Sequence, residues 1–111
     1  MPPPPPQDKT TCVLTAGAAG SGKLDVAFTW QGSVAVVHEV RCTIWEYKAM
    51  PGGGFNFTIA GNFNNPNVLS VGSGSYSITN RTAGTTYIAV AELHRNGQVV
   101  ASSQTGYVNA P

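Results

Sequence analysis

The sequence predicts an all-β protein, a two-sheet antiparallel β-sandwich of seven or eight strands. Turn-forming segments rich in Gly, Pro, Asn and Ser recur roughly every 8 to 12 residues. Residues 24–30 alternate apolar and polar side chains with a period of two, the pattern of a strand that buries one face. Asn96-Gly97 separates two β-rich runs and favours a two-residue type I′ hairpin, because both residue types tolerate a positive φ. No segment shows the apolar period of a helix.

Length and composition limit the chain to one small domain with few charged groups. It has 111 residues, of which 10% are charged, and a formal net charge of +1. Its six Lys and Arg residues are spread singly, so the sequence offers no basic patch to a nucleic acid. No apolar run approaches the roughly 20 residues that cross a bilayer, and the N-terminus lacks the pattern of a signal peptide. We therefore expect no nucleic acid partner, no membrane insertion and no export signal.

Residues 1–9 are expected to form an N-terminal arm, and residues 10–111 the β-sandwich domain. Consecutive prolines fix φ and remove amide donors, so they favour a stiff polyproline II rod over a strand. Such an arm is either a spacer or a segment that docks into a groove on a partner. As a docking segment, it would bind through its five prolines: Pro2, Pro3, Pro4, Pro5 and Pro6.

The remaining turn signals divide the sandwich into strands. We expect strands over 10–16, 24–30, 34–48 and 55–60, a short one near 68–71, and further strands that begin at Tyr76, at Tyr87 and after Asn96-Gly97. Segments rich in Gly (17–22, 51–54 and 72–74) and a segment rich in Asn (61–67) are expected to be turns and loops.

Cys12 and Cys42 each alternate in phase with apolar neighbours and are expected to point into the core. Their spacing fits neither a CxxC redox pair nor a structural zinc site. They either form a disulfide between the two sheets or remain buried thiols, and a reducing compartment favours the thiols.

Two segments of the chain carry a family resemblance. Leu24-Asp25-Val26 leads to Phe28 or Trp30, and Tyr76-Ser77-Ile78 is followed by Ala83-Gly84-Thr85-Thr86-Tyr87. These core and turn positions, over most of residues 10–108, resemble the fibronectin type III module, an immunoglobulin-like β-sandwich. The later segment of that module is typically Tyr-x-Ile-x-x-Leu-x-Pro-Gly-Thr-x-Tyr, and this chain has Arg81 and Ala83 in place of the leucine and the proline. The resemblance implies a tyrosine corner at Tyr87 and specifies no function.

No motif in the chain supports an enzyme or a cofactor site. Residues 17–23 fit part of a phosphate-binding loop, but Leu24 stands where the loop needs Ser or Thr, and a strand pattern follows where it needs a helix. His38 and His94 have no nucleophile motif beside them, and the five acidic residues are scattered. His38 is in phase with core residues, whereas His94 is expected to be solvated. We expect no catalytic residue, no metal and no cofactor.

Strand parity predicts one apolar outer face. If Tyr87 points inward, as a tyrosine corner requires, then Ile88 and Val90 point outward. In the long central strand, inward-pointing Val40, Cys42 and Ile44 leave Trp45 and Tyr47 outside. Because these two strands are neighbours in a fibronectin-like sheet, the candidate partner-binding residues are Trp45, Tyr47, Ile88 and Val90. The alternative parity would place Ile88 and Val90 in the core and the small Ala89 and Ala91 outside.

These features predict a non-enzymatic structural or interaction module. One hypothesis is a virion protein, a bacteriophage capsid decoration or tail-associated protein that binds protein subunits at the virion surface through its arm and one sheet face. The other is a spacer or carbohydrate-binding module for adhesion in a secreted bacterial protein. There, exposed Trp and Tyr side chains would stack on sugar rings and the proline arm would be a linker.

Overall fold

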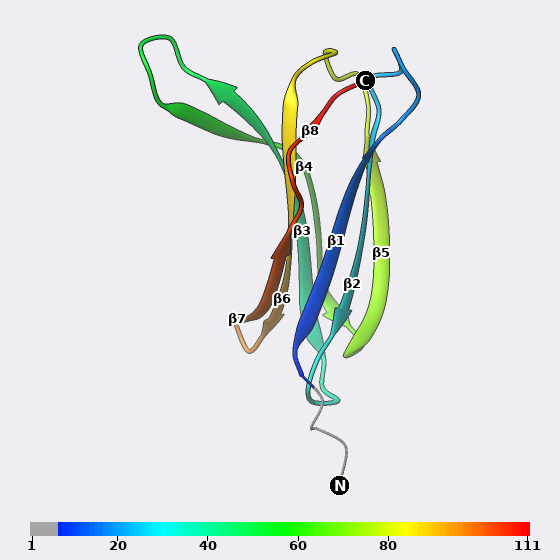
Figure 1. Cartoon of the computed structure of the whole chain (residues 1–111). Helices are drawn as coiled ribbons and strands as arrows, with labels where there is room; N and C mark the ends of the chain where they lie inside the picture. Colours follow the sequence, from blue (N-terminus) through cyan, green and yellow to red (C-terminus); the bar gives the residue numbers. More distant parts are fainter. Residues whose placement is uncertain (1–6) are drawn as a thin grey trace, which may run out of the picture.

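The computed structural model describes residues 7–111, and it is an all-β sandwich of two antiparallel sheets (Figure 1). The expected arm residues Pro2 to Pro6 lie outside the described residues. One sheet has three strands in the order β1-β2-β5, and the other has five, in the order β4-β3-β6-β7 with β8 beside β6. The strands are β1 (Lys9–Ala16), β2 (Leu24–Gln31), β3 (His38–Ala49), β4 (Phe55–Val68), β5 (Val71–Ile78), β6 (Thr86–Arg95), β7 (Gln98–Gln104) and β8 (Val108–Asn109). The predicted fold class is therefore confirmed.

The core lies between the two sheets and is formed by alternate residues of the central strands. In β2 the inward positions are Leu24, Val26, Phe28 and Trp30, all buried, while the intervening side chains face solvent. The facing sheet contributes Val40, Cys42 and Ile44 from β3, and Tyr87, Ala89, Ala91 and Leu93 from β6. The alternation of apolar and polar residues along a central strand thus indicates which of its faces is buried.

The tight turn forms where the sequence places it, and Tyr87 is buried at the position where the resemblance implies a tyrosine corner. Asn96 and Gly97 join β6 to β7 with φ of 54° and 77°, the positive values that a type I′ turn requires. Tyr87 is buried at the start of β6, and its hydroxyl lies 3.0 Å from the hydroxyl of Thr85. Because Thr85 donates its own proton to the Thr82 carbonyl at 2.6 Å, Tyr87 is linked to the preceding loop through Thr85.

Three segments differ from the expected strand boundaries. The strand expected from Val34 begins at His38, because residues 32–37 cross from the three-stranded to the five-stranded sheet. The Asn-rich segment 61–67 is part of β4, where Pro66 is tolerated at a sheet edge beside a register shift. Residues 72–74, expected as a turn, lie inside β5, so no separate short strand forms near 68–71 and the strand expected to begin at Tyr76 begins at Val71.

The glycines of β5 make room for aromatic rings of the neighbouring strand. Gly72 and Gly74 stand opposite Trp30 and Phe28 in β2. A Cβ atom at Gly74 would lie 2.7 Å from Cζ of Phe28, and one at Gly72 would overlap the Trp30 indole. The two rings therefore lie over the β5 backbone, and glycine here marks a close approach of side chain to backbone rather than a turn.

A β-bulge at Ala60 reverses which side chains of β4 face outward. Gly61 and Phe63 oppose Ile44 and Cys42 on the inner face, but Trp45 pairs with Ile59, so Ala60 has no partner. Phe55, Phe57 and Ile59 share the sequence parity of Phe63, yet they point to the outer face. Because of the bulge, three residues that a regular strand would place on the inner face lie on the outer surface instead.

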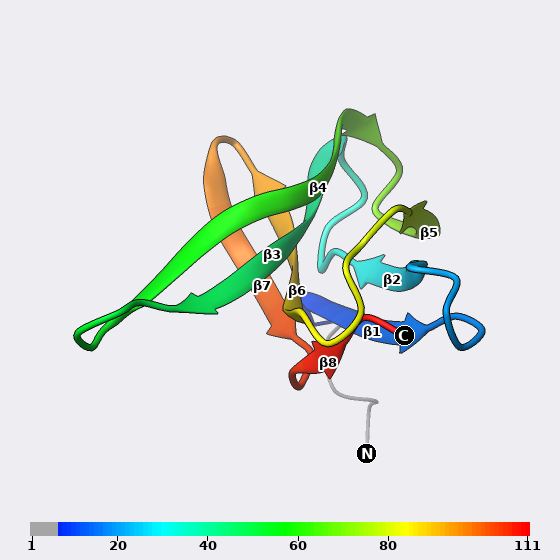
Figure 2. The ribbon, with the colours of Figure 1, turned by 90° about the horizontal axis from the view of Figure 1, so that it is seen from above.

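The β3–β4 hairpin extends beyond the rest of its sheet. β6 pairs with β3 only as far as Tyr47, so residues 48–56 form a two-stranded projection that ends in the glycine turn 52–54. Figures 1 and 2 show this hairpin leaving the body of the sandwich, at the end opposite the start of β1. One face of the projection continues the outer face of the five-stranded sheet.

Candidate interaction face

The outer face of the five-stranded sheet is divided into an apolar half and a polar half. Cross-strand partners share a face, so the pairs Tyr47–Phe57, Trp45–Ile88 and Thr43–Val90 place these side chains on the same surface. We define the aromatic face as the apolar half toward the projecting hairpin: Trp45, Tyr47, Phe55, Phe57, Ile59, Ile88, Val90 and Tyr107.

The four residues that strand parity selects lie together on this face. Trp45, Tyr47 and Val90 are half-buried, and Ile88 is 8% exposed because neighbouring side chains of the same face cover it. The inward positions of β6 are taken by Tyr87, Ala89 and Ala91, so the alternative parity does not occur. Whether a partner binds these residues remains a prediction.

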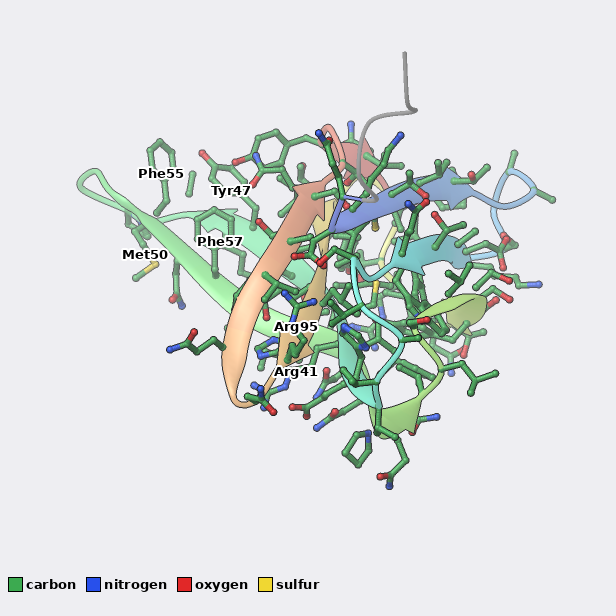
Figure 3. All side chains as sticks on the ribbon, turned by 90° about the horizontal axis from the view of Figure 1, so that it is seen from below. Arg41, Tyr47, Met50, Phe55, Phe57 and Arg95 are labelled. Carbon is green, nitrogen blue, oxygen red and sulfur yellow. The ribbon has the colours of Figure 1, made fainter. Side chains whose placement is uncertain are left out.

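Four members of the aromatic face were missed by sequence reasoning. The exposed fractions are 66% for Phe55, 44% for Phe57, and 59% for both Ile59 and Tyr107. The Tyr47 ring is central, with centroids 5.0 Å from Phe55, 5.4 Å from Phe57 and 5.5 Å from Tyr107. Figure 3 shows Tyr47, Phe55 and Phe57 together along the hairpin, away from Arg41 and Arg95. Gly61, directly after the strand expected over 55–60, was the available signal of the bulge that exposes three of the four.

A shallow groove runs through the aromatic face. It has a volume of about 340 Å³ and is lined by Trp45, Phe57, Ile88, Val90, Gln104 and Tyr107. No charged residue lines it, and the polar groups that its lining side chains carry are the Gln104 amide, the Trp45 indole N–H and the Tyr107 hydroxyl. Aromatic rings with few charges are typical of the centre of a protein interface.

A second apolar groove lies at the other end of the sandwich. It has a volume of about 530 Å³ and is lined by the two loops that follow β2 and β4: Ala35, Val36, Val37, Val68, Leu69, Ser70 and Val71. This groove contains no aromatic side chain. It offers apolar contact without the flat ring surfaces of the aromatic face.

The polar half of the outer face carries two charged contacts. Arg41 Nε lies 3.1 Å from Glu39 Oε2, and His94 Nε2 lies 3.2 Å from Glu92 Oε1. The expectation that His94 is solvated is wrong, because its side chain is buried where β6 pairs with β3 and β7. This half of the face therefore differs in chemistry from the aromatic face beside it.

Asp8 fixes the point from which the N-terminal arm leaves the sandwich. Its carboxylate accepts two hydrogen bonds from Arg95, at 2.8 and 3.0 Å, and one from the Ser33 backbone N–H at 2.7 Å. Arg95 Nη1 also donates to His38 Nε2 at 3.2 Å, while His38 Nδ1 donates to the Val36 carbonyl at 2.7 Å. The bonds from Arg95 and Ser33 hold the pKa of Asp8 well below its usual range. Asp8 is therefore held at the end of β6 that leads into the turn to β7.

Cys12 and Cys42 face each other across the core as thiols. Cys12 lies in β1 and Cys42 in β3, so the pair joins the inner faces of the two sheets. A hydrogen bond between the two thiols lowers the pKa of Cys12, and the same bond together with burial raises the pKa of Cys42. Cys12, which is half-buried, is thus the more reactive member of the pair.

The described residues hold no recognised metal or membrane-spanning feature. Within residues 7–111, no three His, Cys, Asp or Glu side chains are grouped so that they could bind a metal ion. The same part of the chain has no helix that is both long and apolar enough to cross a membrane.

No family model matches this chain, and no curated protein matches it in sequence. Among solved structures, the chain is similar to the crystal structure of a protein assigned as a beta-galactosidase, from Bacteroides fragilis, with a TM-score of 0.57 and 13% sequence identity. The match covers 93% of this chain but only 20% of the other, so this chain spans about a fifth of that protein's length. At this identity the similarity concerns the β-sandwich fold alone.

Proposed function

We propose that this protein is a non-enzymatic interaction module that attaches to a larger protein assembly through its aromatic face. The observation that carries the proposal is the gathering of Trp45, Tyr47, Phe55, Phe57 and Tyr107 on one uncharged surface. Contiguous exposed apolar surface is uncommon on monomeric proteins and marks interaction sites. Large aromatic side chains also contribute most of the binding energy at many interfaces.

The assembly that fits best is a virion, with this protein as a capsid decoration or tail-associated module of a bacteriophage. The sandwich is fibronectin type III-like in its turn residues and in the adjacency of β3 and β6. A shell presents many identical sites, so weak contacts add up through effective concentration when a module uses more than one of them. The aromatic face supplies a contact with the shell, and Pro2 to Pro6 supply a second contact within the assembly.

A second candidate is a spacer or carbohydrate-binding module of a secreted bacterial protein. Exposed Phe57 and Tyr107 beside Trp45 offer flat rings on which a sugar can stack. The similarity to part of a beta-galactosidase-like chain supports only the point that such a sandwich occurs within a longer protein.

Cosedimentation separates the two candidates. Intact capsids of the virus whose genome encodes the chain should carry the purified protein into the pellet, and soluble polysaccharides should leave its migration in affinity electrophoresis unchanged. A protein that stays in the supernatant with intact shells would refute the virion proposal. Retardation by a polysaccharide would favour the second candidate.

A further inference from the structure

The groove of the aromatic face has the chemistry of a polyproline site. A polyproline II segment has apolar rings and free backbone carbonyls, and it docks into aromatic grooves that also present hydrogen-bond donors. Trp45, Phe57 and Tyr107 provide the rings, and the Gln104 amide and the Trp45 indole N–H are donors. The groove has no charged lining residue, which suits a ligand that has no side-chain charge.

The chain itself contains a matching ligand. Pro2 to Pro6 are consecutive, and the proline ring fixes φ near the value of polyproline II. Such a segment loses little conformational entropy when it binds in that conformation. The second apolar groove, between the loops after β2 and β4, lacks aromatic rings and is the poorer match.

The position of Asp8 prevents an arm from filling the groove of its own molecule. Asp8 is bound to Arg95, at the end of β6, whereas the groove begins at Val90. Arg95 lies five positions along β6 from Val90, a distance of about 17 Å. The span from Asp8 to Pro2 in polyproline II is about 19 Å, so at most the tip of the arm would reach the groove. Five prolines can lie along the groove only if they come from another copy.

We propose that Pro2 to Pro6 of one copy bind the groove of a second copy, lined by Trp45, Phe57, Ile88, Val90, Gln104 and Tyr107. The contact is head to tail, so it links copies into open chains, or into rings where a symmetric surface closes them. This inference rests on the proposed role of the aromatic face as a binding surface, and it identifies the ligand of its groove. Phe55 on the projecting hairpin and Ile59 in the adjoining part of β4 stay free for the shell.

Complementation between two variants tests the proposal. The arm variant replaces Pro3, Pro4 and Pro5 with Ser, and the groove variant is Tyr107→Ser, at a residue that is exposed and outside the core. In sedimentation equilibrium up to ~1 mM, the range of weak association, the wild type should form concentration-dependent oligomers. Each variant alone should be monomeric, and a 1:1 mixture should form heterodimers and nothing larger, since it has one intact arm and one intact groove per pair.

The matched control is Leu69→Ser in the second groove, which should associate as the wild type does. A wild type that remains monomeric, a mixture that fails to form heterodimers, or a loss of association in Leu69→Ser would each overturn the proposal. A monomeric wild type that nonetheless pellets with shells would reject this inference and leave the proposed function intact.

Discussion

Asp8 is the residue that ties the start of β1 to the opposite sheet. Its carboxylate contacts the Arg95 guanidinium through two hydrogen bonds and the Ser33 N–H through a third. Such a bidentate, charge-assisted contact fixes direction as well as distance. The root of the arm therefore has a defined position although the contact itself is near the surface.

Replacing Asp8 with Asn should lower the free energy of unfolding at neutral pH. It should also make that free energy depend less on pH in the acid range. The folded-state pKa of Asp8 lies below its unfolded value, which is about 3.9. The stabilisation is therefore complete above about pH 4 and is lost as the pH falls toward the folded-state pKa. Urea denaturation should give a higher free energy of unfolding for the wild type than for Asp8→Asn at pH 7, and the difference should be smaller at pH 3. An advantage of equal size at both pH values would contradict this role for Asp8.

Individual surface residues were predictable where the strand is regular. The inward position of Tyr87 fixes Ile88 and Val90 on the outer face, because parity is preserved along β6. Phe55 and Phe57 were not predictable in this way, because the bulge at Ala60 changes parity within β4. A bulge depends on pairing with β3, which local sequence does not specify.

Among the elements, β5 shows why glycine alone does not identify a turn. The segment Gly72-Ser73-Gly74 has the composition of a flexible loop. Its two glycines are two positions apart, however, and both occupy inward positions of the edge strand β5. Phe28 and Trp30 fill the space that side chains would need. Identifying this strand requires knowledge that β2 is its neighbour.

Gly74→Ala should destabilise the fold by about 1–3 kcal/mol, the usual cost of overpacking a core. The added Cβ would lie 2.7 Å from Cζ of Phe28, and the buried ring has little room to move. Gly106→Ala is the matched control, because no heavy atom lies within 4 Å of its added Cβ. Chemical denaturation of both variants provides the comparison, and a Gly74→Ala protein as stable as Gly106→Ala would show that Phe28 does not cover β5.

At the scale of the whole molecule, the sandwich and its strand number followed from turn spacing and alternation alone. The neighbour relation between β3 and β6 followed from the fibronectin-like pattern. The projecting hairpin could not be predicted from the sequence, because its length depends on where β6 stops pairing with β3. The inward phase of Cys12 and Cys42 was visible in the sequence, and their contact across the two sheets was not.

Treatment with a small-molecule disulfide should join Cys12 to Cys42. The Cys12 thiolate attacks the reagent first and releases one reagent thiolate. Cys42 then loses its proton and attacks Cys12 Sγ in the mixed disulfide, which releases the second reagent thiolate and forms the Cys12–Cys42 bond. A link between positions 12 and 42 should add about 3–4 kcal/mol to the free energy of unfolding in the chain-entropy model. Intact mass and melting temperature measure the result, with Cys12→Ser as the control. Unchanged stability in the oxidised protein would mean that bond formation strains the contact between the sheets.

The most direct test of the aromatic face compares two outer-face variants for binding to intact capsids. Trp45→Ser removes a ring that lines the groove of the aromatic face, and Val13→Ser changes an exposed apolar residue on the outer face of the three-stranded sheet. We predict that the affinity obtained from the pelleted fraction falls at least about tenfold for Trp45→Ser, a loss of roughly 1.4 kcal/mol, and is unchanged for Val13→Ser. Loss of stability in Trp45→Ser with no loss of binding, or equal binding by both variants, would contradict the account.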